Sequence, residues 1–415
     1  MGTYSYEQDG ENKLTSTSFF RGENTNFHPT DASLRQPLAI PDYVIQGLAP
    51  DEKFVTKDTA IVAFGSCFAS NISNYLNSRG YNVLNRGNND AYVTKLGDGM
   101  VNTYAILQQF QWAWENKAPT VAVWHGKKAE DFAQSEDVRL ETKALFDAAD
   151  FFIITLGLSE LWYDEPSGEV FWRAVPKSAY EPGRHKFRAA THAETLANLH
   201  HIYALIRRYR PHARVLFSVS PIPLTATFRQ ISCLAADAVS KATIRSALDE
   251  FLSSHGQSDG VYYFPSYEAV KRLFHHQWGD DRRHVRRDIL DFNMMMFEHY
   301  YCSPGIPFEL LQEAYDHAWE LDIQRGEQMR TRPVISYQEH RARRKQAKIE
   351  ARIEERRRER ERIIETRKAE RRRQNEVKRT KTKLITSFAL KAALVLLAIE
   401  GARGLTMNVA AAVGG

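Results

Sequence analysis

Four short apolar runs, separated by helical patterns, constrain most strongly what this chain can fold into. Runs of this length without polar alternation are typical of strands buried on both faces. Strands that alternate with helices form right-handed crossovers and a mainly parallel sheet. The sequence therefore predicts a three-layer α/β/α domain, with strands at residues 60–64, 151–156, 214–220 and 261–264.

Helical signals stand between these strands. Residues 66–80 repeat apolar side chains at helical spacing directly after the first strand. Thr191 and Glu194 form the pattern of a capping box, ahead of a helix that reaches to Pro211. A further helix is expected around residues 235–252.

The charge of the chain is concentrated in one segment. The whole sequence holds 56 Lys and Arg against 51 Asp and Glu, a formal net charge of +5. Residues 341–384 contain 20 of these basic residues and 8 of the acidic ones, which leaves 36 basic and 43 acidic residues for the rest. The basic segment therefore gives no information about what the mildly acidic body does.

These patterns divide the chain into four parts. We expect an N-terminal extension over residues 1–54, which is polar and rich in turns, and the α/β domain over 55–330. A long charged helix is expected over 338–383, and an apolar tail rich in small residues over 384–415.

The basic helix has three candidate roles. Residues 338–383 contain no Pro or Gly, so one helix on the order of 70 Å long is expected, without the heptads of a coiled coil. It is either a solvated helix without a partner, a binder of a polyanion such as nucleic acid or anionic lipid, or part of a tail that lies on a membrane surface. The apolar stretch from Leu384 to Ile399 is interrupted by Lys391 and is shorter than the roughly 20 residues that span a bilayer.

Cysteine usage and the N-terminus bear on the compartment. The chain has 3 cysteines, Cys67, Cys233 and Cys302, with no paired spacing that predicts a disulfide framework or a metal site. Its first residues lack the basic start and apolar core of a signal peptide. We therefore expect a cytoplasmic protein, with membrane-surface association as the alternative, and neither a metal nor an organic cofactor.

The first candidate site follows the first strand. In parallel sheets, ligands bind beyond the carboxyl ends of the strands. Gly65 permits a tight turn there, which places Ser66 and Cys67 at the N-terminus of the next helix. The positive end of a helix favours an anionic oxygen or a thiolate, so either residue is a candidate nucleophile. The alternative is that Ser66 only caps the helix and that Cys67 is a small buried residue.

Two further candidates follow later strands. Asp281 and His284 lie three residues apart, so a single short loop can supply a general base and the carboxylate that orients it. The alternative is a solvated polar loop. Gly157 and Ser159 follow the second strand and offer donors for an oxyanion, unless Ser159 is simply a helix N-cap.

These residues carry a family resemblance. The segment GSCFA at 65–69 is the signature of the GSCFA-domain family, and further blocks of the chain look like that family's blocks in the same order. They are TLGLSELW at 155–162, SPIP at 220–223, YFPSYE at 263–268 and WGDDRRHV at 278–285, within a match of about 55–305. That family is similar to the SGNH (GDSL-like) hydrolases, whose flavodoxin-like α/β/α members cleave esters of lipids, carbohydrates and small molecules.

The resemblance implies roles for the candidate residues. It places the nucleophile within 65–67, and the usual Phe-Gly-Asp-Ser pattern puts Cys67 in that position, whereas a shift of one residue restores Ser66. Because serine is the rule in the superfamily, Ser66 is the preferred nucleophile. The resemblance also implies that Asp281 and His284 complete a triad, and that Gly157 and Ser159 form an oxyanion block in which Ser159 replaces the usual Asn. Gly99 and Asn102 are the nearest candidates for the remaining oxyanion block.

Two functions follow as hypotheses. The first is an SGNH-like hydrolase or acyl transferase that acts on an acylated carbohydrate or a small-molecule ester. The second is a catalytically weak α/β domain that binds a glycan or polyanion and is tethered by its basic helix. The oligomeric state is not predicted by any of these patterns.

Overall fold

The computed structural model of the chain describes residues 2–8, 10–17, 25–96, 99–122, 135–172, 174–331 and 336–411. The chain divides into two compact units, Met1–Thr331 and Arg332–Gly415.

A parallel sheet forms the centre of the first unit. Its order is β3-β4-β7-β8, and every neighbouring pair is parallel. On the edge of β3 that does not pair with β4, Ile61 forms an isolated parallel bridge with Val83. The four strands are β3 (Ile61–Gly65), β4 (Phe151–Leu156), β7 (Arg214–Val219) and β8 (Val261–Tyr263), so all four predicted runs are confirmed as strands.

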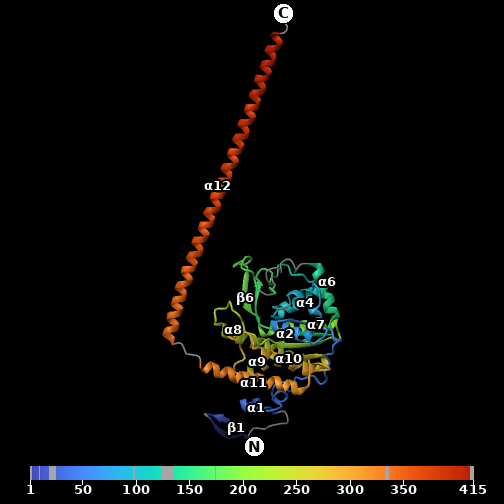
Figure 1. The fold of residues 1–415 in the computed structure, drawn as a ribbon. Coiled ribbons are helices and arrows are strands. Elements are labelled where there is room, and N and C mark those ends of the chain that lie inside the picture. Colours follow the sequence, from blue (N-terminus) through green and yellow to red (C-terminus); the bar gives the residue numbers. More distant parts are fainter. Residues whose placement is uncertain are drawn as a thin grey trace. The chain divides into compact units, whose positions relative to one another are not determined.

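Successive side chains of the strands enter two separate cores, because strand side chains alternate between faces. Val62 and Ile154 pack in one core and Ile61 and Ile153 in the other. The first core is covered by α3 (Tyr92–Leu96), α4 (Thr103–Glu115), α6 (Glu136–Ala148), α7 (His192–Tyr209) and α8 (Cys233–Ser254). The second is covered by α2 (Cys67–Ser78), α9 (Ser266–Arg272), α10 (Arg287–Tyr301) and α11 (Phe308–Arg330). The predicted three layers are therefore present (Figure 1).

Local signals also match the structure in part. Thr191 and Glu194 form the predicted capping box at the start of α7. Short 3-10 helices occupy Leu84–Arg86 and Gln257–Asp259.

The sequence patterns did not predict an antiparallel hairpin made of β5 (Glu160–Asp164) and β6 (His185–Ala189). Since a strand follows Ser159 at once, this residue is not the N-cap of a helix.

The N-terminal residues add a β-hairpin and two short helical elements to this unit. Strands β1 (Gly2–Gln8) and β2 (Glu11–Thr17) pair as an antiparallel hairpin. A short helix α1 (Asp31–Leu34) and a π-helical turn (Ile40–Val44) follow. Leu34, Ile40 and Val44 are buried in the second core, so this part of the extension packs against the domain.

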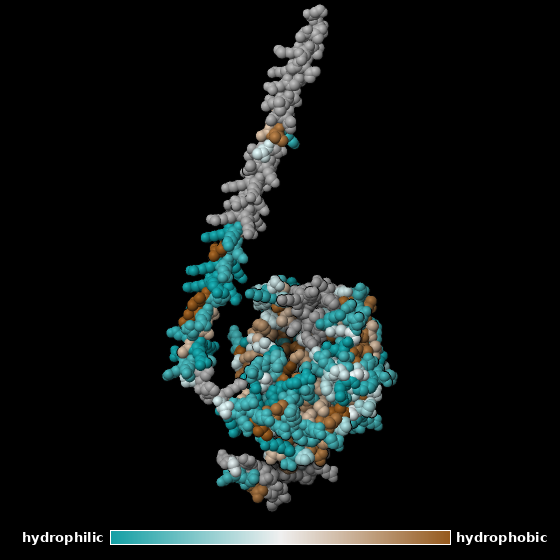
Figure 2. Space-filling model, in the orientation of Figure 1, coloured by the Kyte–Doolittle hydropathy of each residue, from teal (hydrophilic) through white to brown (hydrophobic). Residues whose placement is uncertain are grey.

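The second unit is one long helix, α12 (Tyr337–Ala411). It continues without a break through the predicted basic segment and into the apolar tail. Figure 2 shows its described surface as mostly hydrophilic. Exposed apolar side chains on this helix include Ile353, Ile363 and Ile364. Ion pairs one turn apart, such as Glu354 with Arg358, lie along this surface. In the described parts of the chain, no helix combines the length and the apolar character needed to cross a membrane.

Candidate active site

A cleft of about 470 Å³ lies where strands β3, β4 and β7 end. Ser66 and Cys67 follow β3, Gly157 and Leu158 follow β4, and Ser220 follows β7. The segment before α4, the β5–β6 hairpin, the loop after β7 and the loop before α10 form its walls, through residues that include Gly99, Asn102, Glu160, Trp162, Phe187, Phe228 and Arg283. The carboxyl ends of the parallel strands therefore form the cleft, as expected for this kind of sheet.

Gly65 sets the position of the first site residues. Its φ is +125°, and a Cβ built on it would lie 2.2 Å from the carbonyl oxygen of Thr155. Only glycine lets β3 turn this close to β4. The start of α2 is consequently held directly beside the end of β4.

Ser66 and Cys67 have different environments. The Ser66 hydroxyl oxygen caps α2 by accepting the N–H of Phe68 at 3.2 Å, and it lies 2.8 Å from the Thr155 hydroxyl. Ser66 is only 3% exposed. Cys67, the first residue of α2, is exposed. Ser66 therefore caps α2, as the alternative interpretation of the sequence stated. The other part of that interpretation, a small buried Cys67, is wrong because Cys67 is exposed.

Two backbone groups expected to hold an oxyanion are already used. The Gly157 N–H donates to the carbonyl oxygen of Val101 at 2.7 Å, and the Gly99 N–H donates to that of Gly65 at 2.8 Å. The assignment of the Gly157 N–H as an oxyanion donor is therefore not supported, because its hydrogen bond fixes the strand end instead.

The side chains of Ser159 and Asn102, both expected to hold an oxyanion, have different environments. Ser159 is buried, and both its N–H and its hydroxyl donate to the Ser240 hydroxyl, at 2.7 and 3.3 Å. It does not line the cleft. Asn102 does line it, as the N-cap of α4. Its Oδ1 accepts the Ala105 N–H at 2.9 Å, so the amide nitrogen remains as its donor group.

Asp281 and His284 form a pair in the loop before α10. Nδ1 of His284 lies 2.5 Å from Oδ2 of Asp281, while Oδ1 accepts the N–H groups of Arg283 and His284 at 3.0 Å. These backbone donors, together with the imidazole, lower the pKa of Asp281 from 3.8 to about 2. The carboxylate is therefore ionised at neutral pH and holds Nδ1, which leaves Nε2 to exchange a proton.

The pair is placed at the margin of the cleft. The side chains of Asp281 and His284 are 48% and 69% exposed, and neither lines the cleft. Arg283, between them in sequence, does line it and donates to the Pro223 carbonyl at 3.4 Å. The structure thus brings Ser66, Cys67, Gly99, Asn102 and Gly157 together, with the Asp281–His284 pair in the adjoining loop.

An aromatic wall was missed by the sequence analysis. Trp162 and Phe187 are cross-strand partners in the β5–β6 hairpin, with ring centroids 5.1 Å apart. Phe228, from the loop after β7, packs against both rings at 4.9 and 5.0 Å. Residues 160–164 and 185–189 show no polar and apolar alternation that would mark them as strands, and they are too far apart in the chain for their pairing to be predicted.

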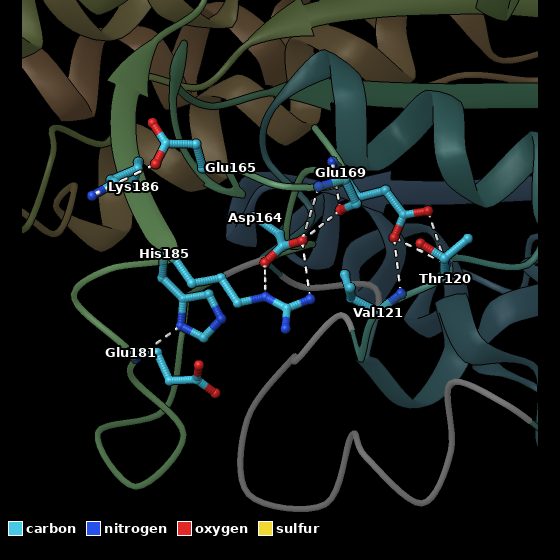
Figure 3. A network of polar contacts seen from close by, with 10 residues as sticks. Thr120, Val121, Asp164, Glu165, Glu169, Glu181, His185 and Lys186 are labelled. Carbon is cyan, nitrogen blue, oxygen red and sulfur yellow. Dashed lines mark hydrogen bonds and ion pairs between the residues drawn. The ribbon is translucent and has the colours of Figure 1, made fainter.

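A polar network holds this hairpin (Figure 3). Asp164, with a fully buried side chain, pairs with Arg184 across the hairpin. Glu169 accepts the backbone N–H groups of Thr120 and Val121 at 2.8 and 3.0 Å. The guanidinium of Arg184 lowers the pKa of Asp164 from 3.8 to about 2. The Asp164–Arg184 pair therefore holds the two strands of the hairpin together, and Glu169 anchors the hairpin to the segment that follows α4.

Glu160 is a second residue that the sequence analysis did not assign. Its side chain is 2% exposed and lines the cleft. One carboxylate oxygen, Oε1, accepts the Thr227 hydroxyl at 3.0 Å and faces Arg229 at 3.4 Å. The other, Oε2, is buried and has no hydrogen-bond partner among the described residues. A buried carboxylate oxygen of this kind requires a donor, which a ligand in the cleft can supply.

Among the described residues, no group of three or more His, Cys, Asp or Glu side chains is arranged to hold a metal ion. The cleft lining offers the thiol of Cys67, the carboxylate of Glu160 and the amide of Asn102, and the imidazole of His284 lies in the adjoining loop.

Known proteins that are similar to this chain include solved esterase structures. A carbohydrate esterase family 3 structure from Talaromyces cellulolyticus is similar at 11% identity, over 63% of this chain and 99% of the other, with a TM-score of 0.29. An acetyl esterase mutant with an acetate ion is similar at 10% identity, over the same shares, with a TM-score of 0.28. No curated protein matches the chain. The model of the GSCFA family matches residues 60–297, more than half of the sequence. The chain belongs to the GSCFA family.

Proposed function

We propose that this protein transfers the acyl group of an ester to water or to another acceptor, with Cys67 as the nucleophile. The observation that carries the proposal is the exposed thiol of Cys67 at the first turn of α2, in a cleft beside Asn102. The helix N-terminus favours a thiolate there. The adjoining loop supplies an imidazole whose Nδ1 is held by an ionised carboxylate, as a general base requires.

The reaction has two steps. His284 Nε2 takes the thiol proton, the Cys67 sulfur forms a bond to the ester carbonyl carbon, and the carbonyl oxygen becomes an oxyanion. Collapse breaks the bond to the alcohol oxygen, which receives the proton from the imidazolium, and a thioester remains. Water, deprotonated by His284, then attacks the thioester, releases the acid and restores the thiol. An alcohol in place of water makes the protein an acyl transferase.

The oxyanion donor in this proposal is the Asn102 amide nitrogen. Asn102 is supported because it lines the cleft with its Oδ1 already fixed by the helix cap. Such preorganised donors act most strongly in sites that exclude water.

Cys67 replaces Ser66 as the preferred nucleophile. The Ser66 hydroxyl is buried and bonded to Thr155 and Phe68, so an attack by it requires both contacts to break. Cys67 is exposed at the first turn of α2 and lines the cleft. This choice also agrees with the position of the nucleophile in the Phe-Gly-Asp-Ser pattern.

The alcohol part of the substrate is proposed to be a hydroxyl-bearing ring such as a sugar. The aromatic wall of Trp162, Phe187 and Phe228 offers a flat apolar surface for such a ring. The buried Oε2 of Glu160 accepts a hydroxyl hydrogen. Both features lie in the cleft that contains Cys67.

Labelling with two probes tests the nucleophile. We expect iodoacetamide to modify Cys67 and a fluorophosphonate to leave Ser66 unmodified, with each site identified by mass spectrometry of peptides. With 4-nitrophenyl acetate as substrate, Cys67→Ala should lower kcat/KM by about a thousandfold or more, and acetylated protein should no longer form.

Ser66→Ala is the matched control. It should reduce stability by about 1 kcal/mol through loss of the helix cap, while acetylation of Cys67 persists. If Ser66→Ala abolished acetylation and Cys67→Ala did not, the assignment of the nucleophile would be wrong.

The second candidate function, a glycan-binding domain without catalysis, is favoured by the unpartnered Glu160 oxygen and the aromatic wall. It predicts that glycan binding, measured by calorimetry, is lost in Trp162→Ala, and that no thioester forms with any ester in a panel of acylated glycosides.

A further inference from the structure

Lys241, on α8, lies buried beneath the cleft. Its ammonium donates to the carbonyl oxygen of Gly157 at 2.5 Å and to that of Ser220 at 2.7 Å. Lys241 is only 2% exposed. Gly157 directly follows β4 and Ser220 directly follows β7, and both line the cleft. One side chain thus joins the two strand ends that lie next to the site.

The residue before it makes a related contact without a charge. The Ser240 hydroxyl accepts the Ser159 N–H at 2.7 Å, on the same turn that follows β4. A neutral side chain is therefore able to fix part of this turn. Burying an ammonium costs free energy even when carbonyl oxygens accept its hydrogen bonds. Because a neutral donor could also hold the backbone, that role alone does not explain why the side chain at this position is charged.

The charged groups around Lys241 come from three helices. Burial lowers the pKa of Lys241 from 10.5 to about 8, Asp237 of α8 and the thiolate of Cys67 of α2 raise it, and Lys271 of α9 lowers it. The ammonium is therefore the main form at pH 7. The ammonium is hydrogen-bonded to Gly157 and Ser220, which line the cleft together with Cys67, and a positive charge in this place favours an anion at Cys67. The charged residues among the described cleft lining are Glu160 of β5 and Arg283 of the loop before α10.

We propose that Lys241 is a positioning residue of the cleft, whose buried ammonium fixes the ends of β4 and β7 and supplies the positive charge that stabilises an anion at Cys67. This inference rests on the proposed role of Cys67. It gives the cleft a fixed positive charge that the substrate does not contact, because the ammonium acts through the peptide groups of Gly157 and Ser220 and through space.

The test measures the alkylation rate of Cys67 by iodoacetamide between pH 5 and 10 in the full chain, by mass spectrometry of the Cys67 peptide. In Lys241→Met we expect the midpoint of the pH profile to rise by about one unit, so that alkylation at pH 7 slows roughly tenfold. Lys241→Gln keeps a donor for one carbonyl but no charge, and should show a similar rise even if Lys241→Met does not fold.

Ser240→Ala is the matched control, since it removes a neutral contact to the same turn. Its midpoint should equal that of the unchanged protein. The proposal is overturned if Lys241→Gln has the unchanged midpoint, or if Ser240→Ala raises the midpoint as much as Lys241→Gln does. Alkylation of Cys67 needs no ester hydrolysis. If the Lys241 variants showed the expected rise in the alkylation midpoint while the unchanged protein had no esterase activity, the proposed function would be contradicted and the role of Lys241 would stand.

Discussion

At the scale of single residues, Gly65 is the position on which the site depends most directly. We expect Gly65→Ala to lower the free energy of unfolding by more than the roughly 1–2 kcal/mol that a left-handed backbone costs a residue with a Cβ. The added Cβ would also lie 2.2 Å from the Thr155 carbonyl oxygen, so β3 and β4 must separate. Urea denaturation measures the loss.

Gly80→Ala is the control for this prediction. Gly80 has a φ of +80° but no atom within 4 Å of an added Cβ, so only the backbone cost applies. Equal losses for the two variants would show that the contact with Thr155 is not limiting.

At the scale of elements, the β5–β6 hairpin depends on ionised carboxylates. The pKa of Asp164 is about 2 in the folded chain, below its usual 3.8, because Arg184 holds the carboxylate. A lowered pKa contributes stability that is complete above the unfolded value and is lost as the pH falls through the folded one. We therefore expect stability to decline from about pH 4 towards pH 2, with a smaller decline in Asp164→Asn, as measured by urea denaturation at each pH.

Glu165→Gln is the control in the same hairpin. Glu165 is 55% exposed and lies 3.7 Å from Lys186, an arrangement that contributes little to stability. If the loss of stability between about pH 4 and pH 2 were as small in Glu165→Gln as in Asp164→Asn, the role given to the buried Asp164–Arg184 pair would be contradicted.

At the scale of the whole molecule, the two units are expected to separate in function. Deleting residues 332–415 should leave the melting temperature of the first unit within a few degrees, because the division into units falls at Thr331. The truncated chain should also lose binding to heparin, since the deleted helix carries the excess of basic residues. Calorimetry and elution from heparin at rising salt measure the two effects, and equal retention of both chains would exclude α12 as the polyanion site.

Much of the fold was predictable because its signals are local. The apolar runs at 151–156 and 214–220 and the capping box at Thr191 use short-range rules of strand burial and helix capping, and each is found in the structure. The β5–β6 hairpin was not predictable in this way. Its strands are separated by about 20 residues of turns, and their pairing depends on Asp164 and Arg184 meeting in space.

The sequence by itself determined that the chain forms a parallel α/β sheet and that Gly65 ends its first strand. These conclusions depend on neighbours along the chain. Only the tertiary structure decided that Ser66 is tied to Thr155, that the Gly157 N–H is used by Val101, and that Lys241 lies beneath the cleft. The reason is physical: exposure and hydrogen bonding depend on which distant strands and helices pack together, and no spacing in the sequence contains that information.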